Sequence, residues 1–412
     1  MKKISVPARR WYENKEKILS FPTRWQVDNL TSPGLEKKAL SAGQIKKRID
    51  HPVDGAPLTE LARGKKQAVI VFDDMTRPTP VKDVAPHILK SLHLAGMKKE
   101  QVRFIWALGS HGAYDMIAAR KKLGDEIVEN YPVYNHDPFQ NVVHAGKTSG
   151  GIEVFLNREF MACDLKIGIG CITPHVHVGF GGGAKIIFPG VAGIESIKHF
   201  HEHFNVDPSR HGLGNFENNT MRFECDAAGD LARLNFKVDC LVNRRGEIAN
   251  LYAGAFRATH QRGADEAKDS YAIKTSGGYD IVIANTYAKA NESGIAMLLI
   301  RQLLRKDKRG VGVIISDAPE GQVPHYVFGP WGTDYGGHHY KFMTKGRMPQ
   351  MMKKLIVLNP RPTPSCLKWI GYEDDITVAK TWPEVLRILR KDFTAAARVG
   401  VIQDATMQYL KK

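Results

Sequence analysis

A glycine-rich turn that ends in a lysine is the segment with the most specific chemistry. It reads Gly181-Gly-Gly-Ala-Lys185, and its glycines let the backbone adopt positive φ and approach a ligand closely. The N–H groups of such a turn can hold a phosphate. The spacing is not that of a P-loop, because Ile186 stands where the magnesium-binding hydroxyl belongs. Lys185 is therefore a point charge for an anion or a nucleophilic amine that carries a covalent cofactor. The plainer alternative is a flexible turn with an exposed lysine.

Five histidines bracket this turn: His175 and His177 precede it, and His199, His201 and His203 follow it. Imidazole binds nickel, zinc, copper and iron, and it titrates near neutrality. In a helix, His199 and His203 would share a face and His201 would point elsewhere. The spacing leaves open whether 199 and 203 chelate a metal together or 201 is a single ligand.

Two further polar segments follow predicted strands. In the first, Asp73-Asp-Met-Thr-Arg77-Pro, Asp74 or Thr76 can cap the next helix, and Arg77 can clamp a carboxylate or phosphate. The second contains His111, between Ser110 and Gly112, where a general acid or base is well placed. Because functional loops gather at the carboxyl ends of parallel strands, we expect Asp74 and His111 to lie at one edge of a sheet.

A regular alternation of strands and helices positions these segments. The patterns predict strands over 67–72, 102–108 and 165–170 and helices over 81–94 and 115–123. After a break near 276, strands over 279–284 and 310–315 flank a helix over 292–304. The first fifty residues are expected to be irregular or to contain strands. We expect an α/β protein with two domains and mainly parallel sheets. Residues 1–275 would form the cofactor-binding and catalytic domain, and 276–412 a second α/β domain that closes an interdomain cleft holding the active site.

The composition is that of an ordinary globular protein. The chain has 412 residues, 43% hydrophobic and 25% charged, which excludes a disordered protein. Its five cysteines are scattered, as in a reduced cytoplasmic protein, and neither a secretory signal nor a membrane span is expected. The net charge of +16 comes without a nucleic-acid-binding signature, so we expect no nucleic-acid partner but a basic surface that attracts small anions.

Taken together, these segments resemble the nickel-pincer-nucleotide lactate racemase family. The shared segments, in the order that the family has them, are Asp74-Met-Thr-Arg-Pro78, Ala107-Leu-Gly-Ser-His111, Pro174-His175, Gly179-Phe-Gly-Gly-Gly-Ala-Lys185, Pro189-Gly190 and His201. The resemblance covers most of the chain, most clearly residues 67 to 205. It implies an isomerase that racemises or epimerises a small anionic 2-hydroxy acid with a nickel-pincer nucleotide. It also implies that the enzymes of cofactor biosynthesis are partners in maturation.

The resemblance implies a role for each matching residue. Lys185 would hold the pyridinium-derived cofactor covalently through a thioamide, beside Asp74, Gly182 and Gly183. His201 would bind nickel, whose other ligands are two sulfurs and a ring carbon of the pincer. The other implied roles are acid and base for His111 and His175, contact with the substrate anion for Arg77, and further substrate contacts for Gln322 and His325.

The implied reaction avoids removing a very weakly acidic C–H proton. One histidine takes the hydroxyl proton while hydride moves to the pincer, and the resulting 2-keto acid rotates before hydride returns to its other face. Two departures from the family pattern stand out. Gly181 replaces a hydroxyl residue that is common there, and Gly112 replaces a common arginine. Loss of that cation favours a 2-hydroxy acid larger than lactate or differently charged.

Two other classes of protein remain open at this point. One is a zinc-dependent hydrolase that uses the histidine cluster, for which Glu202 is a weak candidate as acidic ligand. The other is a non-catalytic nucleotide- or anion-binding protein built on the glycine turn, which would leave His111 and His175 unexplained. The sequence assigns no role to His338 and His339.

Overall fold

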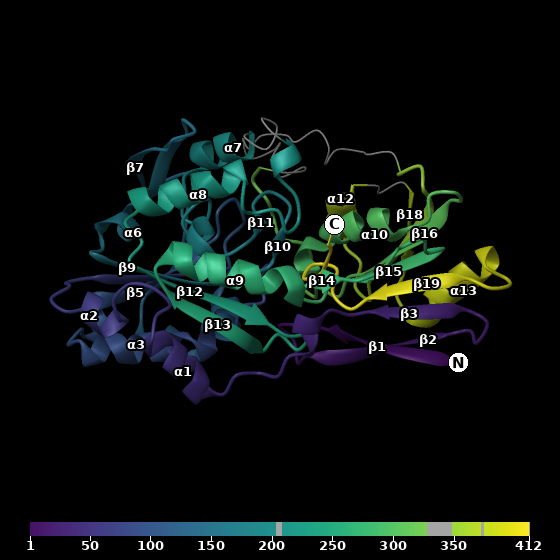
Figure 1. Ribbon diagram of the computed structural model, residues 1–412, viewed down its shortest axis with the longest axis horizontal. Helices are drawn as coiled ribbons and strands as arrows, with labels where there is room; N and C mark the ends of the chain where they lie inside the picture. Colours follow the sequence, from purple (N-terminus) through teal and green to yellow (C-terminus); the bar gives the residue numbers. More distant parts are fainter. Residues whose placement is uncertain (203–207, 328–347, 372–374, 412) are drawn as a thin grey trace. The chain divides into compact units, whose positions relative to one another are not determined.

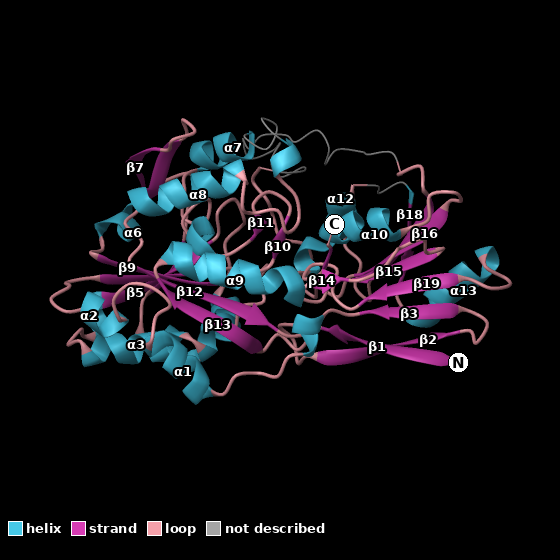
Figure 2. Cartoon of the chain, in the orientation of Figure 1, coloured by secondary structure: helices cyan, strands magenta, loops and turns pink. Residues whose placement is uncertain are grey.

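The computed structural model describes residues 1–202, 208–327, 348–371 and 375–411. Contacts divide the chain into two compact units, one of residues 37–269 and one of residues 1–36 with 270–412 (Figure 1). Each unit contains a six-stranded sheet accompanied by helices (Figure 2). The expected fold class, an α/β protein with two mainly parallel sheets, is therefore confirmed. The cleft between domains and a boundary near residue 276 stay predictions.

The sheet of the 37–269 unit has the strand order β13-β12-β9-β4-β5-β6, and only β13 runs antiparallel to its neighbour. Its strands are β4 (Ala68–Asp73), β5 (Val102–Ala107), β6 (Val133–Asn135), β9 (Leu165–Cys171), β12 (Phe236–Val242) and β13 (Ile248–Gly254). Strands β4, β9 and β12 are buried along their whole length, as parallel strands covered on both faces must be. The three strands predicted in this part of the chain are confirmed to within a residue at each end.

Helices cover both faces of this sheet: α1 and α3 lie on one side, and α7 and α8 on the other (Figure 1). The helices are α1 (Ala42–Asp50), α2 (Leu58–Leu61), α3 (Ala85–Leu94), α4 (Met116–Leu123), α5 (Asp125–Asn130), α6 (Arg158–Ala162), α7 (Ile194–Glu202), α8 (Thr220–Leu231) and α9 (Phe256–Ser270). The helix predicted over 81–94 is a short 3-10 turn followed by α3, with Pro86 in the first turn. The carboxylate of Asp115 caps α4 by accepting the N–H of Ala118 at 2.8 Å.

Two antiparallel hairpins extend from this unit. Strands β7 (Val142–Lys147) and β8 (Glu153–Asn157) form one, and β10 (Pro174–His175) and β11 (Gly179–Phe180) form the other. The second hairpin places His175 on β10 and leads directly into the glycine turn. The turn ends in a 3-10 helix, η4 (Gly183–Ile186), which carries Lys185.

The sheet of the other unit has the order β18-β17-β16-β15-β19-β3, and all its strand pairs are parallel. Its strands are β3 (Gln26–Leu30), β15 (Ile281–Asn285), β16 (Gly310–Ile315), β17 (Met352–Leu358), β18 (Ile376–Ala379) and β19 (Arg398–Ile402). The unit also contains the hairpin of β1 (Lys2–Ala8) with β2 (Lys15–Phe21) and the short pair of β14 (Ala272–Ile273) with β20 (Tyr409–Leu410). Its helices are η1 (Pro33–Glu36), η7 (Ala290–Ala296), α10 (Met297–Leu303), α12 (Pro364–Ile370) and α13 (Trp382–Asp392). Thus the helix predicted over 292–304 is η7 continued by α10.

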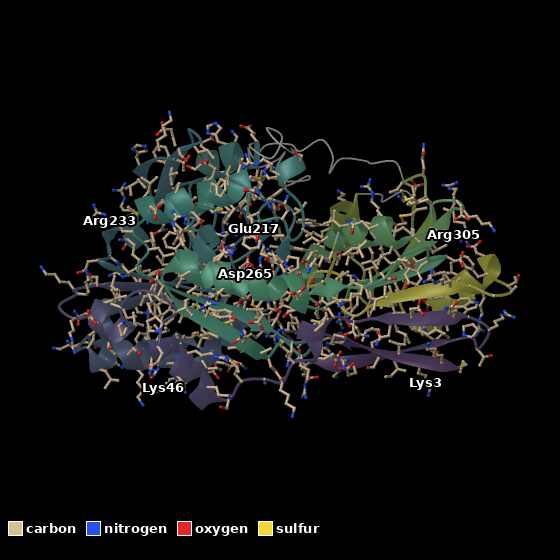
Figure 3. All side chains as sticks on the ribbon, in the orientation of Figure 1. Lys3, Lys46, Glu217, Arg233, Asp265 and Arg305 are labelled. Atoms are coloured by element: carbon tan, nitrogen blue, oxygen red, sulfur yellow. The ribbon has the colours of Figure 1, made fainter. Side chains whose placement is uncertain are left out.

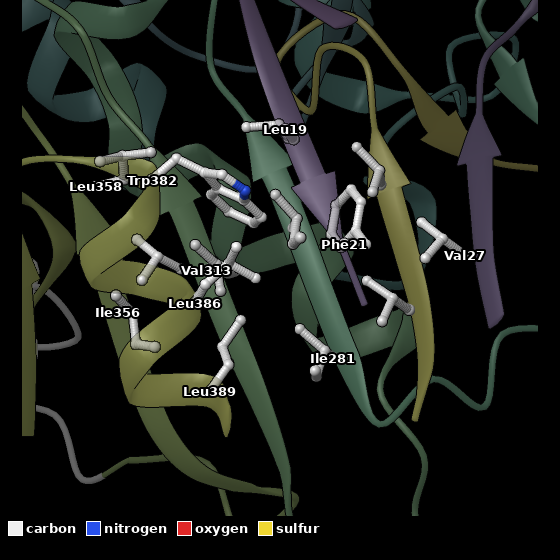
Figure 4. Close-up of a cluster of buried hydrophobic side chains, with 14 of the residues drawn as sticks. Leu19, Phe21, Val27, Ile281, Val313, Ile356, Leu358, Trp382, Leu386 and Leu389 are labelled. Carbon is white, nitrogen blue, oxygen red and sulfur yellow. The ribbon is translucent and has the colours of Figure 1, made fainter. Parts of the chain in front are cut away.

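Apolar clusters on both faces hold this second sheet. On one face, side chains of the β1–β2 hairpin and of α13 pack against the strands (Figure 4). There the rings of Phe21 and Trp382 meet edge to face at 5.3 Å, and the indole N–H of Trp382 donates to the carbonyl of Ser20 at 2.9 Å. On the other face, α10 and α12 pack against the same strands.

Charged side chains lie around the outside of each unit (Figure 3). Among those labelled there, Lys3, Glu217, Arg233 and Asp265 are exposed. None of the helices in the described part of the chain is long and apolar enough to cross a membrane.

Candidate active site

A carboxylate–histidine pair lies at the carboxyl ends of the neighbouring strands β4 and β5. His111 Nδ1 is 2.5 Å from Asp74 Oδ2. The other oxygen of Asp74 accepts hydrogen bonds from the N–H of Thr76 at 2.8 Å and from its hydroxyl at 2.5 Å. This is an Asx turn rather than a helix cap. As expected from the sequence, parallel pairing of β4 with β5 brings the two side chains together.

Electrostatics keep Asp74 ionised. Burial alone would raise its pKa, but the adjacent imidazole of His111 holds the pKa of this carboxyl well below its ordinary value, helped by the charge of Arg77 and the hydrogen bond from Thr76. Because an ionised carboxylate only accepts hydrogen bonds, Nδ1 of His111 carries the hydrogen. When the ring is neutral, Nε2 is the acceptor atom, as in a general base oriented by a carboxylate.

Two side chains that the sequence did not single out hold the glycine turn from inside. Asp239 on β12 is fully buried, and its Oδ2 accepts the N–H of Gly183 at 2.9 Å. Its Oδ1 lies 2.6 Å from Nζ of Lys237, which is also fully buried. Because the N–H of Gly183 points to this carboxylate, it does not serve a phosphate. The glycine turn can approach the carboxylate of Asp239 this closely because Gly182 has no side chain: a Cβ there would lie 2.8 Å from Asp239 Oδ1.

Arg222 on α8 holds the same turn through its carbonyl groups. The buried guanidinium donates to the carbonyl of Gly182 at 3.1 Å and to that of Phe180 at 2.5 Å. The turn is thus fixed on two sides, with Lys185 partly exposed at its end. The positive charge of Lys185 contributes to lowering the pKa values of His177 and His201, so these three side chains lie within electrostatic reach of one another.

The histidines after the turn differ in environment. His201 on α7 is buried and His199 is exposed, whereas His203 lies outside the described residues. Nδ1 of His201 donates to the carbonyl of Ile197 at 2.7 Å, since a carbonyl oxygen can only accept. Burial, and then the nearby charge of Lys185, lower the pKa of His201 to about 4. His201 is therefore neutral near pH 7 and has Nε2 as its acceptor atom.

The two histidines before the turn, His175 and His177, form a row of rings with His201. The ring centroids of His175 and His177 are 5.5 Å apart, and those of His177 and His201 are 5.2 Å apart. Burial, with the charge of Lys185, holds the pKa of His177 well below its ordinary value. The backbone N–H of His177 donates to Nδ1 of His175 at 3.2 Å, so a neutral His175 carries its hydrogen on Nε2. His111 and His175 thus differ in the nitrogen that holds the proton.

The predicted substrate contacts of the 1–36 and 270–412 unit have local partners. The amide of Gln322 accepts from the N–H of Ser293 at 2.9 Å and donates to the carbonyl of Ala290 at 2.9 Å. Nδ1 of His325 accepts the N–H of Val327 at 3.2 Å. The substrate-binding roles of Gln322 and His325 stay predictions. His338 and His339 lie outside the described residues.

Within the described residues, no three His, Cys, Asp or Glu side chains are grouped so that they could hold a metal ion. A hydrolytic zinc ion is held by three protein ligands. A metal that arrives with most of its ligands on an organic cofactor needs a single additional donor, which the Nε2 of His201 can provide.

These features define an α/β protein that has a histidine–carboxylate pair and a lysine-bearing glycine turn at the carboxyl ends of its strands. Residues 12–212 match the family model described as the lactate racemase N-terminal domain. The chain is 29% identical over 248 residues to the lactate racemase of Lactiplantibacillus plantarum and 29% identical over 245 residues to that of Thermoanaerobacterium thermosaccharolyticum. The chain is therefore similar to the lactate racemases, and the family model matches nearly half of its length.

These sequence matches cover 58% of this chain and 58% and 57% of the two relatives, so they span a little over half the length of each. Similarity of fold extends further. The structure of the lactate racemase apoprotein from Thermoanaerobacterium thermosaccharolyticum aligns over the full length of both chains with a TM-score of 0.73 at 21% identity. A crystal structure of a Thermotoga maritima protein covers 91% of this chain and all of its own, with a TM-score of 0.66 at 19% identity.

Proposed function

We propose that this protein is a racemase or epimerase of a 2-hydroxy acid and that it carries a nickel-pincer nucleotide on Lys185. The observation that carries the proposal is the grouping of Lys185, His111 and a neutral, buried His201 within one unit. The family supports the class of reaction, and the residues fit the cofactor. Since such a cofactor must be synthesised and attached, the partners in maturation are its biosynthetic enzymes, and we expect the protein in the cytoplasm.

His201 has the properties of a nickel ligand. Its Nδ1–H bond to the carbonyl of Ile197 fixes the ring orientation and leaves Nε2 as the donor atom, which is how metal-binding histidines are commonly arranged. Lys185 would supply the amine for the thioamide link, and the glycines at 182 and 183 allow close approach to the turn. When bound, the nickel-pincer nucleotide supplies a hydride acceptor.

The chain's own residues would handle protons and orient the substrate. His111 takes the hydroxyl proton on Nε2, and the ionised Asp74 stabilises the imidazolium that results. His175, with hydrogen on Nε2, offers a hydrogen bond to the substrate oxygen when the flat 2-keto acid has turned. Arg77 holds the carboxylate while the rest of the molecule rotates.

The substrate would be a small anionic 2-hydroxy acid, and one larger than lactate or differently charged is favoured. Gly112 follows His111 where an arginine is common in the family, so one cation fewer faces the substrate. We propose that Gln322 and His325 are among the substrate contacts. A chiral-chromatography screen of 2-hydroxy acids with holo-protein identifies the substrate.

The mass of intact protein purified from its native cells tests the proposal directly. We expect an adduct on Lys185, nickel in a stoichiometric metal analysis, and interconversion of the enantiomers of at least one 2-hydroxy acid. Lys185→Ala should lose adduct, nickel and activity together. The matched control is Lys198→Ala, which removes a lysine of α7 that pairs with Glu195 at the surface, and should keep all three. An unmodified Lys185 without nickel in the native holo-protein would refute the proposal.

A further inference from the structure

We propose that Lys122, a residue with no assigned role, is the positioning residue of the Asp74–His111 pair. Its side chain enters the protein from α4 and is 0% exposed. The ammonium lies 2.8 Å from Oδ1 of Asp73 and donates to the main-chain carbonyls of Asp74 at 2.8 Å and Arg77 at 2.9 Å. Two N–H groups of the ammonium thus have carbonyl acceptors, and the carboxylate of Asp73 lies within ion-pair distance.

The cost of burying a charge indicates that Lys122 stabilises the loop of residues 73–77 rather than helix α4. Lysine is almost never fully buried unless it is paired, and an apolar side chain of similar volume is often as stable or more so. The inner face of α4 is otherwise apolar, with Ala118, Ala119 and Leu123 buried. The carboxylate and the two carbonyls that the ammonium meets belong to residues 73–77, the segment that contains both Asp74 and Arg77. The buried charge therefore specifies the conformation of that segment.

The ion-pair partner of Lys122 is itself held in place. The second oxygen of Asp73 accepts a hydrogen bond from the hydroxyl of Thr79. Lys122 and Thr79 thus bind the carboxylate of Asp73 from two sides, one from α4 and one from the chain just after the loop. The backbone between these two anchors carries Asp74.

The link to chemistry runs through the backbone of Asp74. Lys122 binds the carbonyl of the residue whose carboxylate binds Nδ1 of His111. Without the ammonium, the carbonyls of Asp74 and Arg77 lose a buried donor, and the loop must move to find another. His111 would then lose the partner that keeps the hydrogen on Nδ1, and Nε2 would no longer be a dependable acceptor. Lys122 does not contact the substrate itself.

The test compares Lys122→Met with Lys166→Met. Lys166 is also buried, with its ammonium 2.6 Å from the carbonyl of Cys163. It lies at the amino end of β9, whereas the candidate site lies at the carboxyl ends of the strands. The inference rests on the proposed function for its activity readout, so we add nitrogen NMR of histidine-labelled protein, which reports the tautomer of His111 with or without cofactor. For Lys122→Met we expect about a 100-fold lower kcat, the effect of a misplaced catalytic group, with a smaller change in KM. We also expect a mixed tautomer at His111, whereas Lys166→Met should keep both.

Each outcome bears on one proposal or the other. A Lys122→Met variant that retains kcat and the Nδ1–H tautomer overturns the positioning role. If that variant does not fold, Lys122→Gln replaces it, because the amide retains two N–H donors, and we expect a smaller loss in the same two measurements. A tautomer change with no racemase activity in the native protein upholds the role of Lys122 and refutes the proposed function.

Discussion

Replacing Gly182 with alanine should disrupt the turn that carries Lys185. Gly182 has φ +86° and ψ −171°, a region that essentially only glycine occupies. The new Cβ would lie 2.4 Å from Cδ1 of Ile172 and 2.8 Å from Oδ1 of Asp239. The end of an isoleucine side chain can rotate away. The carboxylate of Asp239 cannot, because it is bound by Lys237 and by the N–H of Gly183.

The size of the effect follows from these two contributions. A residue forced into that backbone region costs about 1–3 kcal/mol, and an extra methyl group in a packed site costs about 1–3 kcal/mol more. The free energy of unfolding should fall by about 2–6 kcal/mol, against about 5–15 kcal/mol for a whole domain. A protein that remains folded should therefore hold the turn in an altered position.

Urea unfolding and intact mass measure these two consequences. The matched control is Gly96→Ala, since Gly96 has φ +93° but no atom within 4 Å of its added Cβ. That variant should lose only about 1–2 kcal/mol from backbone strain. Gly182→Ala should be less stable than Gly96→Ala and should carry less adduct on Lys185. Equal stability of the two variants would show that Asp239 does not constrain the turn as argued.

Two further predictions concern protonation. Asp74→Asn should lower kcat by about 10³- to 10⁴-fold with the cofactor still attached, because an amide N–H facing Nδ1 of His111 favours the wrong tautomer; chiral chromatography with intact mass checks this, and a kcat within threefold of the native value contradicts it. His136, which is buried between the carbonyl of Ala192 and the amide of Asn157, has its pKa lowered by burial to about 4 from an ordinary 6.5. As the pH falls from 6.5 towards 4, the unfolded chain takes up a proton that the folded protein does not, so about 3 kcal/mol of stability present at pH 7 should be lost. Urea midpoints between pH 7 and 4 should fall less steeply in His136→Gln, and parallel slopes would exclude His136 as the cause.

Local patterns predicted most of the elements around the site. The apolar run that ends at Asp73 is β4, and Asp115 caps α4 where the predicted helix begins. The first fifty residues were harder to interpret. There β3 joins the second sheet by parallel pairing, Val27 beside Val399, with a partner at the other end of the chain. A short strand of mixed polarity gives no indication of so distant a partner.

The sequence predicted the positions of Asp74 and His111 but not the residues that hold them. Asp74 and His111 were expected at one edge because both follow strands, and β4 and β5 prove to be neighbours. By contrast, nothing in a single sequence distinguishes Lys122 and Lys237, which are fully buried, from the lysines that are exposed to solvent. Burial of a charge depends on the partner it meets: Lys122 on α4 pairs with Asp73 of β4, and Lys237 pairs with Asp239 two residues along its own strand.

The two buried Lys–Asp pairs share one structural requirement. Lys122 with Asp73 lies beneath the Asp74 loop, and Lys237 with Asp239 lies beneath the glycine turn. Strand β9 runs between β4 and β12, and at Gly170 an added Cβ would lie 3.3 Å from Nζ of Lys237 and 3.4 Å from Oδ2 of Asp73. The missing side chain leaves room for charges from both neighbouring strands. Because each lysine is neutralised by its own carboxylate, both loops can be fixed by strong hydrogen bonds without adding net charge beneath the site.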